Sequence, residues 1–367
     1  MFKKYRVLKW TSLFILFLVV AVVCFGFWFK SLLPPINHDD EVATVKDLPY
    51  LSENIVPHRG KILAVVTSTD IMGTSDKSTG YELTELARAY YIFTANGFEV
   101  DVASPKGGKP PVVIDDEDMG EFDFAFLNDS IAQHKTSHTI PMEDVVADDY
   151  EAVFFVGGKG AMFDFPDNKT IQTLVKDYYQ SDKVVGAVCH GPAALVNVKL
   201  DNGASLLENK TVSGFTNKEE LLLISDAESI FPFLLQDKMI EQGANFNEGV
   251  MYLDNVSHDS NLITGQNPWS TWHVAEQMVQ QLGYTPKYRK ITAEENTVKV
   301  LLTYEKQGKK EAKKMIEDLF SENKPMDRIL LAKHSIISVM KGQLGDFPSL
   351  ISLVSYAKKC ETKSKKI

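Results

Sequence analysis

Hydrophobic residues gather along this chain in one long run and several short ones. The long run extends from Trp10 to Phe29, 20 residues without a charged side chain. At about 1.5 Å of rise per residue, a helix of this length spans about 30 Å, the thickness of the hydrocarbon core of a bilayer. The pattern therefore predicts a transmembrane helix over residues 10–29.

Basic residues flank this run unevenly and predict its orientation. Four lysines or arginines lie between positions 3 and 9, whereas only Lys30 follows closely. The positive-inside rule then places residues 1–9 in the cytoplasm and the rest of the chain on the extracytoplasmic side of the membrane. A cleaved signal peptide is the alternative, but its apolar region is usually about 7–15 residues and ends in small residues. This run ends in Phe27-Trp28-Phe29.

The short runs alternate with segments of helical periodicity. Apolar runs that are typical of buried parallel strands cover Lys61–Thr67, Phe98–Ser104, Ala152–Val156 and Val184–Val188. Helical spacing predicts helices over Tyr81–Asn96, Ile171–Tyr179 and Ala193–Val198. Strands that alternate with helices favour an α/β fold with a doubly wound parallel sheet. Ligand sites in such sheets lie beyond the carboxyl ends of the strands.

Charge divides the chain into two parts. The net charge of −10 argues against a nucleic-acid-binding protein, which normally carries a basic surface. From position 286 onward, however, 18 Lys and Arg face 10 Asp and Glu. We therefore predict a linker over 30–58, a catalytic domain over 59–285 and a small helical appendage over 286–367. The basic surface of that appendage either is solvated or rests on anionic lipid.

The strongest chemical signal is the stretch AVCHGPAAL around Cys189. The chain has three cysteines at scattered positions, which do not make a disulfide framework. Cys189 follows a predicted strand and precedes His190-Gly191-Pro192, which is the pattern of a nucleophile elbow between a strand and a helix. A thiol at a helix N-terminus is expected to have a lowered pKa. A buried structural cysteine beside a loop histidine is the alternative.

This stretch resembles the elbow of the PfpI/ThiJ superfamily, whose members have a flavodoxin-like fold related to class I glutamine amidotransferases. Four further segments resemble that family in type and order, and together the five cover about residues 60–285. They include STGYELTELARAYYIFTANGFEVDVASPKGG, VFFVGGKGAMFDFP and LITGQNPWS. The fourth, TVSGFTNKEE, resembles the segment that supplies the triad acid in the heat-shock-inducible glyoxalase III branch.

The resemblance implies a role for each matching residue. Cys189 would be the nucleophile, His190 the base, and Glu220 the acid that orients His190. Glu85 would be the glutamate that approaches the thiol and shuttles protons. Glu82 and Glu219 are competing assignments for the two acids, because a one-residue error in either assignment would move the role.

Two features of the loops bear on catalysis. The backbone N–H groups of Gly158 and His190 are candidates for an oxyanion hole. The glyoxalase III branch usually has a histidine in its glycine-rich loop, where this chain has Lys159. A lysine there favours a thiolate but does not shuttle protons near neutral pH. The remaining histidines show no paired ligand spacing, so we predict no metal site.

The resemblance implies an enzyme of the glyoxalase III (D-lactate dehydratase) type, a stress-response lyase that converts methylglyoxal to lactate without a cofactor. Two other functions stay open: a protein deglycase, amidase or peptidase that uses the same triad, and a redox-sensing or holdase chaperone. The expected partners are a small aldehyde substrate and the membrane, and the resemblance also admits a homodimer. No nucleic-acid partner is expected.

Overall fold

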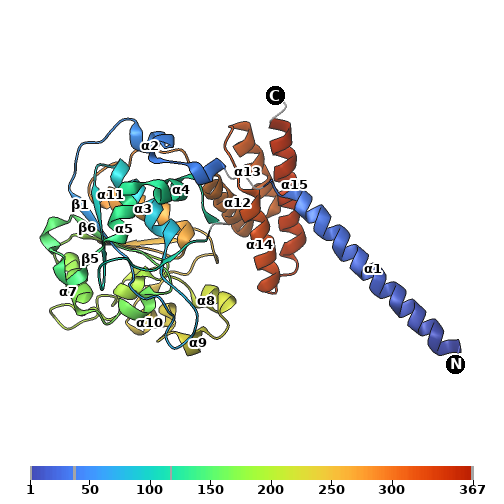
Figure 1. The fold of residues 1–367 in the computed structure, drawn as a ribbon, viewed down its shortest axis with the longest axis horizontal. Coiled ribbons are helices and arrows are strands. Elements are labelled where there is room, and N and C mark those ends of the chain that lie inside the picture. Colours follow the sequence, from blue (N-terminus) through green and yellow to red (C-terminus); the bar gives the residue numbers. More distant parts are fainter. Residues whose placement is uncertain (1, 36–38, 116–117, 365–367) are drawn as a thin grey trace. The chain divides into compact units, whose positions relative to one another are not determined.

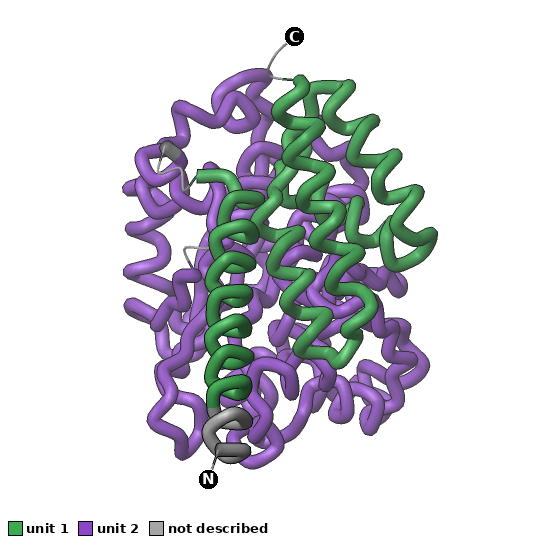
Figure 2. Tube along the Cα trace, turned by 90° about the vertical axis from the view of Figure 1, so that its right-hand side faces the viewer, with its two compact units in different colours: residues 1–36, 291–367 green, residues 37–290 purple. Residues whose placement is uncertain are grey.

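A computed structural model describes residues 2–35, 39–115 and 118–364 of the chain. These residues form two compact units (Figure 2). Unit 1 combines residues 1–36 with 291–367, and unit 2 contains residues 37–290. Residues 37–58, which were predicted to be a linker, belong to unit 2, where Leu48 and Tyr50 are buried.

Unit 2 is built on a seven-stranded sheet with the strand order β10-β11-β7-β6-β1-β3-β5. All neighbouring strands are parallel except the pair β10 and β11, which is antiparallel. The α/β fold with a mostly parallel sheet is therefore confirmed. The strands are β1 (Lys61–Val65), β3 (Glu99–Ser104), β5 (Ile140–Pro141), β6 (Ala152–Phe155), β7 (Val184–Val188), β10 (Val256–Asp259) and β11 (Leu262–Gly265).

Helices cover both faces of this sheet. The helices α3 (Leu83–Ala95) and α11 (Thr271–Gln281) pack together on one face, and α7 (Lys169–Gln180) lies on the other (Figure 1). All side chains of β6 and β7 are buried, as expected for strands between two helical layers. The other helices of unit 2 are α2 (Pro49–Ser52), α4 (Glu121–Asn128), α5 (Ser130–Ser137), α6 (Ala161–Asp164), α8 (Asn217–Leu223), α9 (Ala227–Ile230) and α10 (Leu235–Glu241).

Two short pairs of parallel strands lie outside the main sheet. They are β2 (Tyr81–Glu82) with β4 (Val112–Val113), and β8 (Thr211–Val212) with β9 (Asn245–Phe246). The first pair takes up the start of the helix that was predicted over Tyr81–Asn96, so α3 begins at Leu83.

The helix predicted over Ala193–Val198 was wrong. The segment after Cys189 forms a single 3₁₀ turn over Gly191–Ala194. Leu195 and Val196 are fully buried, so packing against the core decides this segment more than helical propensity does.

Unit 1 is entirely helical over its described residues that form regular structure. It contains α1 (Phe2–Leu32), α12 (Ala293–Gln307), α13 (Lys309–Ser321), α14 (Arg328–Met340) and α15 (Asp346–Ser364). Over Lys9–Leu32, α1 is long and apolar enough to cross a membrane; its most apolar 18-residue window has a mean hydropathy of 2.7, and none of that window is buried.

Candidate active site

Cys189 lies at the carboxyl end of β7, at a sharp turn of the backbone. Its φ of +60° is in the left-handed region, which a residue with a side chain adopts only at a small energetic cost. The turn is held on both sides, because the Cys189 N–H donates to Gly265 O at 3.0 Å and Phe215 N–H donates to Cys189 O at 2.8 Å. The sharp turn of the predicted elbow is therefore present at this residue, although a single 3₁₀ turn and not an α-helix follows it.

The thiol, His190 and Glu220 form a continuous chain of polar contacts. Cys189 Sγ lies 3.3 Å from His190 Nδ1, and His190 Nε2 lies 2.6 Å from Glu220 Oε2. The histidine is 1% exposed, and its ring packs against that of Phe215 with the centroids 4.5 Å apart. The imidazole is thus fixed between a thiol and a carboxylate, as the resemblance implied.

Glu85, in the first turn of α3, also contacts the thiol. It is fully buried, and its Oε2 accepts a hydrogen bond of 2.7 Å from the Gly157 N–H. A Cβ atom at Gly157 would lie 2.5 Å from Glu85 Oε2 and 2.8 Å from Cys189 Cβ. Only glycine at position 157 therefore lets the carboxyl group and the elbow approach each other.

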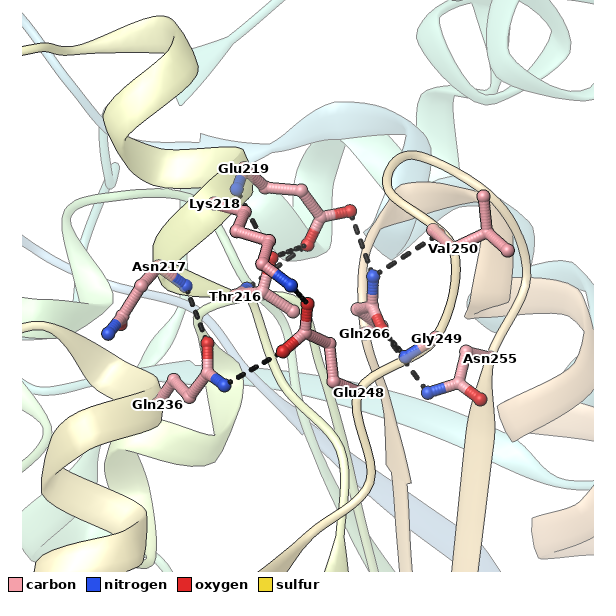
Figure 3. Close-up of polar contacts among 10 residues, drawn as sticks. All are labelled: Thr216, Asn217, Lys218, Glu219, Gln236, Glu248, Gly249, Val250, Asn255 and Gln266. Carbon is pink, nitrogen blue, oxygen red and sulfur yellow. Dashed lines mark hydrogen bonds and ion pairs between the residues drawn. The ribbon is translucent and has the colours of Figure 1, made fainter. Parts of the chain in front are cut away.

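The two neighbouring acids Glu219 and Glu220 have different surroundings. Glu219 closes a capping box with Thr216 at the start of α8: its Oε2 accepts from the Thr216 N–H at 3.1 Å and from the Thr216 hydroxyl at 2.9 Å. Its Oε1 accepts from Gln266 at 3.0 Å and from Asn267 at 2.9 Å. Figure 3 shows Glu219 between Thr216 and Gln266. Of the two acids, only Glu220 contacts His190.

The sequence analysis did not decide between Glu219 and Glu220 as the partner of His190, although the sequence contains a pattern that distinguishes them. Thr216 and Glu219 have the Thr-x-x-Glu spacing of a capping box, which commits Glu219 to the helix start. Gln266, Asn267 and Tyr252, which also hold Glu219, were missed, because nothing in their local sequence marks them as its partners.

Burial changes the ionisation of the site. It raises the pKa of the Cys189 thiol well above its ordinary value, and the neighbouring Glu85 carboxyl adds to this effect. The prediction of a lowered thiol pKa is therefore wrong. It relied on a helix N-terminus, and the single 3₁₀ turn that follows Cys189 has too few aligned peptide dipoles to replace one. In the unliganded site, the sulfur is protonated at neutral pH.

The two acids at the site also differ in charge. Burial raises the pKa of Glu85 well above its ordinary value, which keeps this carboxyl protonated. Burial also opposes ionisation of Glu220, but the charge of His190 and its hydrogen bond outweigh it and lower the pKa of Glu220. The pKa values of the two acids are therefore shifted in opposite directions: Glu85, which contacts the thiol, favours its protonated form, and Glu220, which contacts His190, favours its carboxylate form.

Lys159 and Glu82 lie within electrostatic reach of these groups. The positive charge of Lys159 lowers the pKa of Cys189 and of Glu220, although for Cys189 burial outweighs it. Burial raises the pKa of Glu82 to about 7, with Lys159 opposing that rise. Glu82 is thus a second, partly buried acid near the site. Glu85, in contrast, is the one that contacts both Gly157 and the thiol.

Two backbone N–H groups beside the thiol donate no hydrogen bond to any part of the chain that the structure describes. They belong to Gly158 and His190, and both residues are buried. Gly158 has a φ of +99°, and a Cβ atom there would lie 2.3 Å from Gly80 O, so the loop needs glycine at this position. These are the two donors that were predicted for an oxyanion hole.

Comparison with known proteins identifies the family. The family model described as the DJ-1/PfpI family matches residues 77–281, more than half of the chain. The chain belongs to the DJ-1/PfpI family. The predicted membership of the PfpI/ThiJ superfamily is thereby confirmed, and the matched segment contains Cys189, His190, Glu220 and Glu85.

Relatives in this family support its glyoxalase III branch. A protein of Saccharomyces cerevisiae named glutathione-independent glyoxalase is 31% identical over 233 residues, which cover 60% of this chain and 97% of the relative. "Glyoxalase 3" of Candida albicans is 29% identical over 231 residues, with the same two coverages.

Solved structures match a similar share of the chain. The crystal structure of glyoxalase III from Candida albicans has a TM-score of 0.55 and 27% identity, and the match covers 61% of this chain and 98% of that one. The Rapid Encystment Protein of Francisella tularensis has a TM-score of 0.58 and 36% identity, covering 61% of this chain and 99% of that one.

Proposed function

We propose that this protein is a cysteine-dependent enzyme of the glyoxalase III type, which converts methylglyoxal to lactate without glutathione or another cofactor. One observation carries the proposal: the Cys189 thiol lies between a histidine that is paired with a carboxylate and a buried carboxylic acid. A nucleophile, a base and a separate proton donor are what the conversion of an α-oxoaldehyde requires. The names of the curated relatives support the same substrate class.

The first step forms a bond between sulfur and the aldehyde carbon. Because Glu220 is ionised, His190 keeps its proton on Nε2 and presents Nδ1 to the thiol. His190 Nδ1 accepts the thiol proton as Cys189 Sγ attacks, and Glu220 stabilises the imidazolium that forms. The N–H groups of Gly158 and His190 donate to the developing oxyanion, and Glu85 protonates it to give a hemithioacetal.

The second step moves hydrogen between the two carbons of the substrate. Glu85 is now a carboxylate: it removes the proton from the former aldehyde carbon and passes it to the neighbouring carbonyl oxygen, which gives an enediol. Glu85 then takes the proton of the hydroxyl group on the carbon that holds the sulfur and delivers it to the neighbouring carbon, which gives a thioester of lactate and leaves Glu85 a carboxylate. Water attacks the thioester as Glu85 accepts one of its protons, the sulfur leaves with the proton held by His190, and lactic acid is released. Substrate and water together balance the product, so no oxidant or reductant is needed.

The test uses the full chain in detergent micelles or nanodiscs, with methylglyoxal and no glutathione. Loss of methylglyoxal and formation of lactate are followed together. We expect Cys189→Ala and Glu85→Gln to abolish both, and Cys360→Ala, a thiol in unit 1, to leave both unchanged. Full activity of Cys189→Ala would refute the scheme. Release of amines from glycated peptides without lactate formation would favour a deglycase, and client binding by Cys189→Ala without aldehyde loss would favour a chaperone.

We further propose that α1 is a retained single-pass membrane anchor, with the enzyme on the extracytoplasmic side. Its end is built into unit 1, which argues against removal as a signal peptide: Leu32 is buried, and its carbonyl accepts a hydrogen bond from Arg328 Nη1. The expected result is a full-length protein that stays in the membrane pellet after alkaline carbonate extraction. A shortened N-terminus by mass spectrometry would refute this.

A further inference from the structure

In the C-terminal helices of unit 1 (α12 to α15), the exposed apolar side chains are concentrated at one place. Between residues 291 and 364, all of which the structure describes, the large hydrophobic residues that are exposed are Ile336, Val339, Met340 and Leu344. They lie at the end of α14 and in the turn to α15, a segment that we call the hairpin tip (residues 336–345). Met340 is 54% exposed and Leu344 66% exposed. Such clustering marks a contact surface, because exposed apolar residues are otherwise scattered singly.

Two sets of contacts fix the direction of the α14–α15 hairpin along α1. At the base of the hairpin, Arg328 donates to Leu32 O and Lys358 donates to Ser31 O, so two cations cap the carbonyl end of α1. Nearer the tip, the ring of Phe347 lies 6.3 Å from that of Phe25. The hairpin therefore runs from the end of α1 back toward its N-terminus. Figures 1 and 2 show its helices beside this end of α1.

The position of Phe25 in α1 sets the depth that the tip reaches. Phe25 precedes the last residue of the uncharged run, Phe29, by four positions, which is about 6 Å along a helix. If α1 spans a bilayer, the level of Phe347 is thus about 6 Å inside the hydrocarbon boundary. Interfacial segments bury their apolar face about 5–10 Å deep, so the depth and the composition of the tip agree.

We propose that the hairpin tip is a second membrane contact, which dips into the outer leaflet beside α1 and inserts Val339, Met340 and Leu344 among the lipid chains. The proposal rests on the membrane anchoring proposed above. Lipid is the occupant that the contacts favour, because the tip is continuous with the lipid-facing surface of α1 through Phe25 and Phe347. Lys341 is the one basic residue of the tip, and its long side chain reaches the headgroups from this depth.

This contact would orient unit 1 on the membrane. A single helix leaves the attached domain free to rotate about its axis, whereas a second insertion point beside it fixes one side of the bundle toward the lipid. The basic end of α15, with Lys358, Lys359 and Lys363, then stays at the opposite end of that helix from the tip. These three lysines and the apolar tip are thereby separated along one hairpin.

The test measures the depth of single labels in the full chain. In a background of Cys24→Ser, Cys189→Ala and Cys360→Ala, cysteines are introduced one at a time and carry an environment-sensitive fluorophore. Met340→Cys and Leu344→Cys probe the tip. Val20→Cys is the reference in the middle of α1, and Ser321→Cys, an exposed residue at the end of α13, is the reference for water. The protein is placed in phosphatidylcholine vesicles that contain lipids with a quencher at a defined depth.

We expect the two tip labels to have blue-shifted emission and to be quenched most by a shallow quencher, while the Val20 label is quenched most by a deep one. The Ser321 label should respond only to a water-soluble quencher. Tip labels that behave like the Ser321 label would overturn the proposal, and so would tip labels shielded from both kinds of quencher, which would indicate a second copy of the chain. If the Val20 label is not quenched by lipid, the anchor itself has failed. A quenched Val20 label with an aqueous tip refutes the hairpin contact alone.

Discussion

Replacing Glu220 with glutamine tests the assignment of the orienting acid most directly. The substitution keeps the shape of the side chain and removes its charge, so the 2.6 Å contact with His190 loses its ionic character. A hydrogen bond to a charged group contributes about 1.5–3 kcal/mol. If that amount is lost in the transition state, where His190 carries a positive charge, kcat/KM for methylglyoxal falls about 10- to 150-fold, at about 1.4 kcal/mol per factor of ten.

Glu219→Gln is the matched control, one residue away and equally buried. Glu219 is acceptor to Thr216, Tyr252, Gln266 and Asn267, so an amide nitrogen at this position leaves at least one buried donor unpaired. This costs about 1–3 kcal/mol of the free energy of unfolding. We therefore expect Glu219→Gln to lower stability in urea while the folded fraction keeps its kcat/KM. The reverse pattern, with Glu220→Gln near wild-type activity and Glu219→Gln inactive though folded, would refute the assignment.

The pH dependence of stability adds a second readout for Glu220. Because the pKa of Glu220 is lower in the folded state, the pair with His190 stabilises the fold above the unfolded carboxyl pKa of about 4.3, and this contribution is lost as the pH falls through the folded pKa. Urea unfolding at several pH values should thus show a smaller loss of stability in acid for Glu220→Gln than for the wild type. Parallel curves would contradict the ionic pairing.

Three further predictions concern the surroundings of the site. Gly157→Ala should abolish activity and lower the melting temperature, because the new Cβ would lie 2.7 Å from the carbonyl oxygen of Val188, the residue before Cys189. Gly120→Ala is the control and should change neither, because a Cβ at that position meets nothing within 4 Å. The alkylation rate of Cys189 in the unliganded enzyme should keep rising above pH 9, because burial raises its pKa; a plateau reached by about pH 8.5, the pKa of a free thiol, would contradict that burial. Arg88→Met should cost about 3–5 kcal/mol of unfolding free energy, because it removes the positive charge that is paired with the buried Asp123 carboxyl group; a loss below about 1 kcal/mol would show that the pair is dispensable.

The elements whose sequence pattern is local were predicted well. The runs that form β1, β3, β6 and β7 are short and apolar and are bounded by glycine or polar residues, so their strand character follows from composition alone. Cys189 at the end of β7 was found for the same reason, since a buried strand that breaks at Gly191-Pro192 is a local signal.

The predictions that failed depended on tertiary packing. A helix after the elbow was expected because residues 193–198 are mostly apolar. In the structure, their side chains pack into the core and do not form one apolar face of a helix. The prediction of a lowered thiol pKa depended on that helix and on exposure of the sulfur to solvent. The structure provides neither, because Cys189 is 5% exposed.

The sequence by itself determined where a nucleophile stands on an α/β sheet and which segment is apolar enough to cross a membrane, because both depend on residues that are neighbours along the chain. Only the tertiary structure decided which of two adjacent glutamates meets His190, that Glu85 contacts the Cys189 thiol, and that Phe347, next to the tip of a distant hairpin, lies beside Phe25. Those contacts join residues tens to hundreds of positions apart, and their distances and ionisation follow from the burial that folding creates.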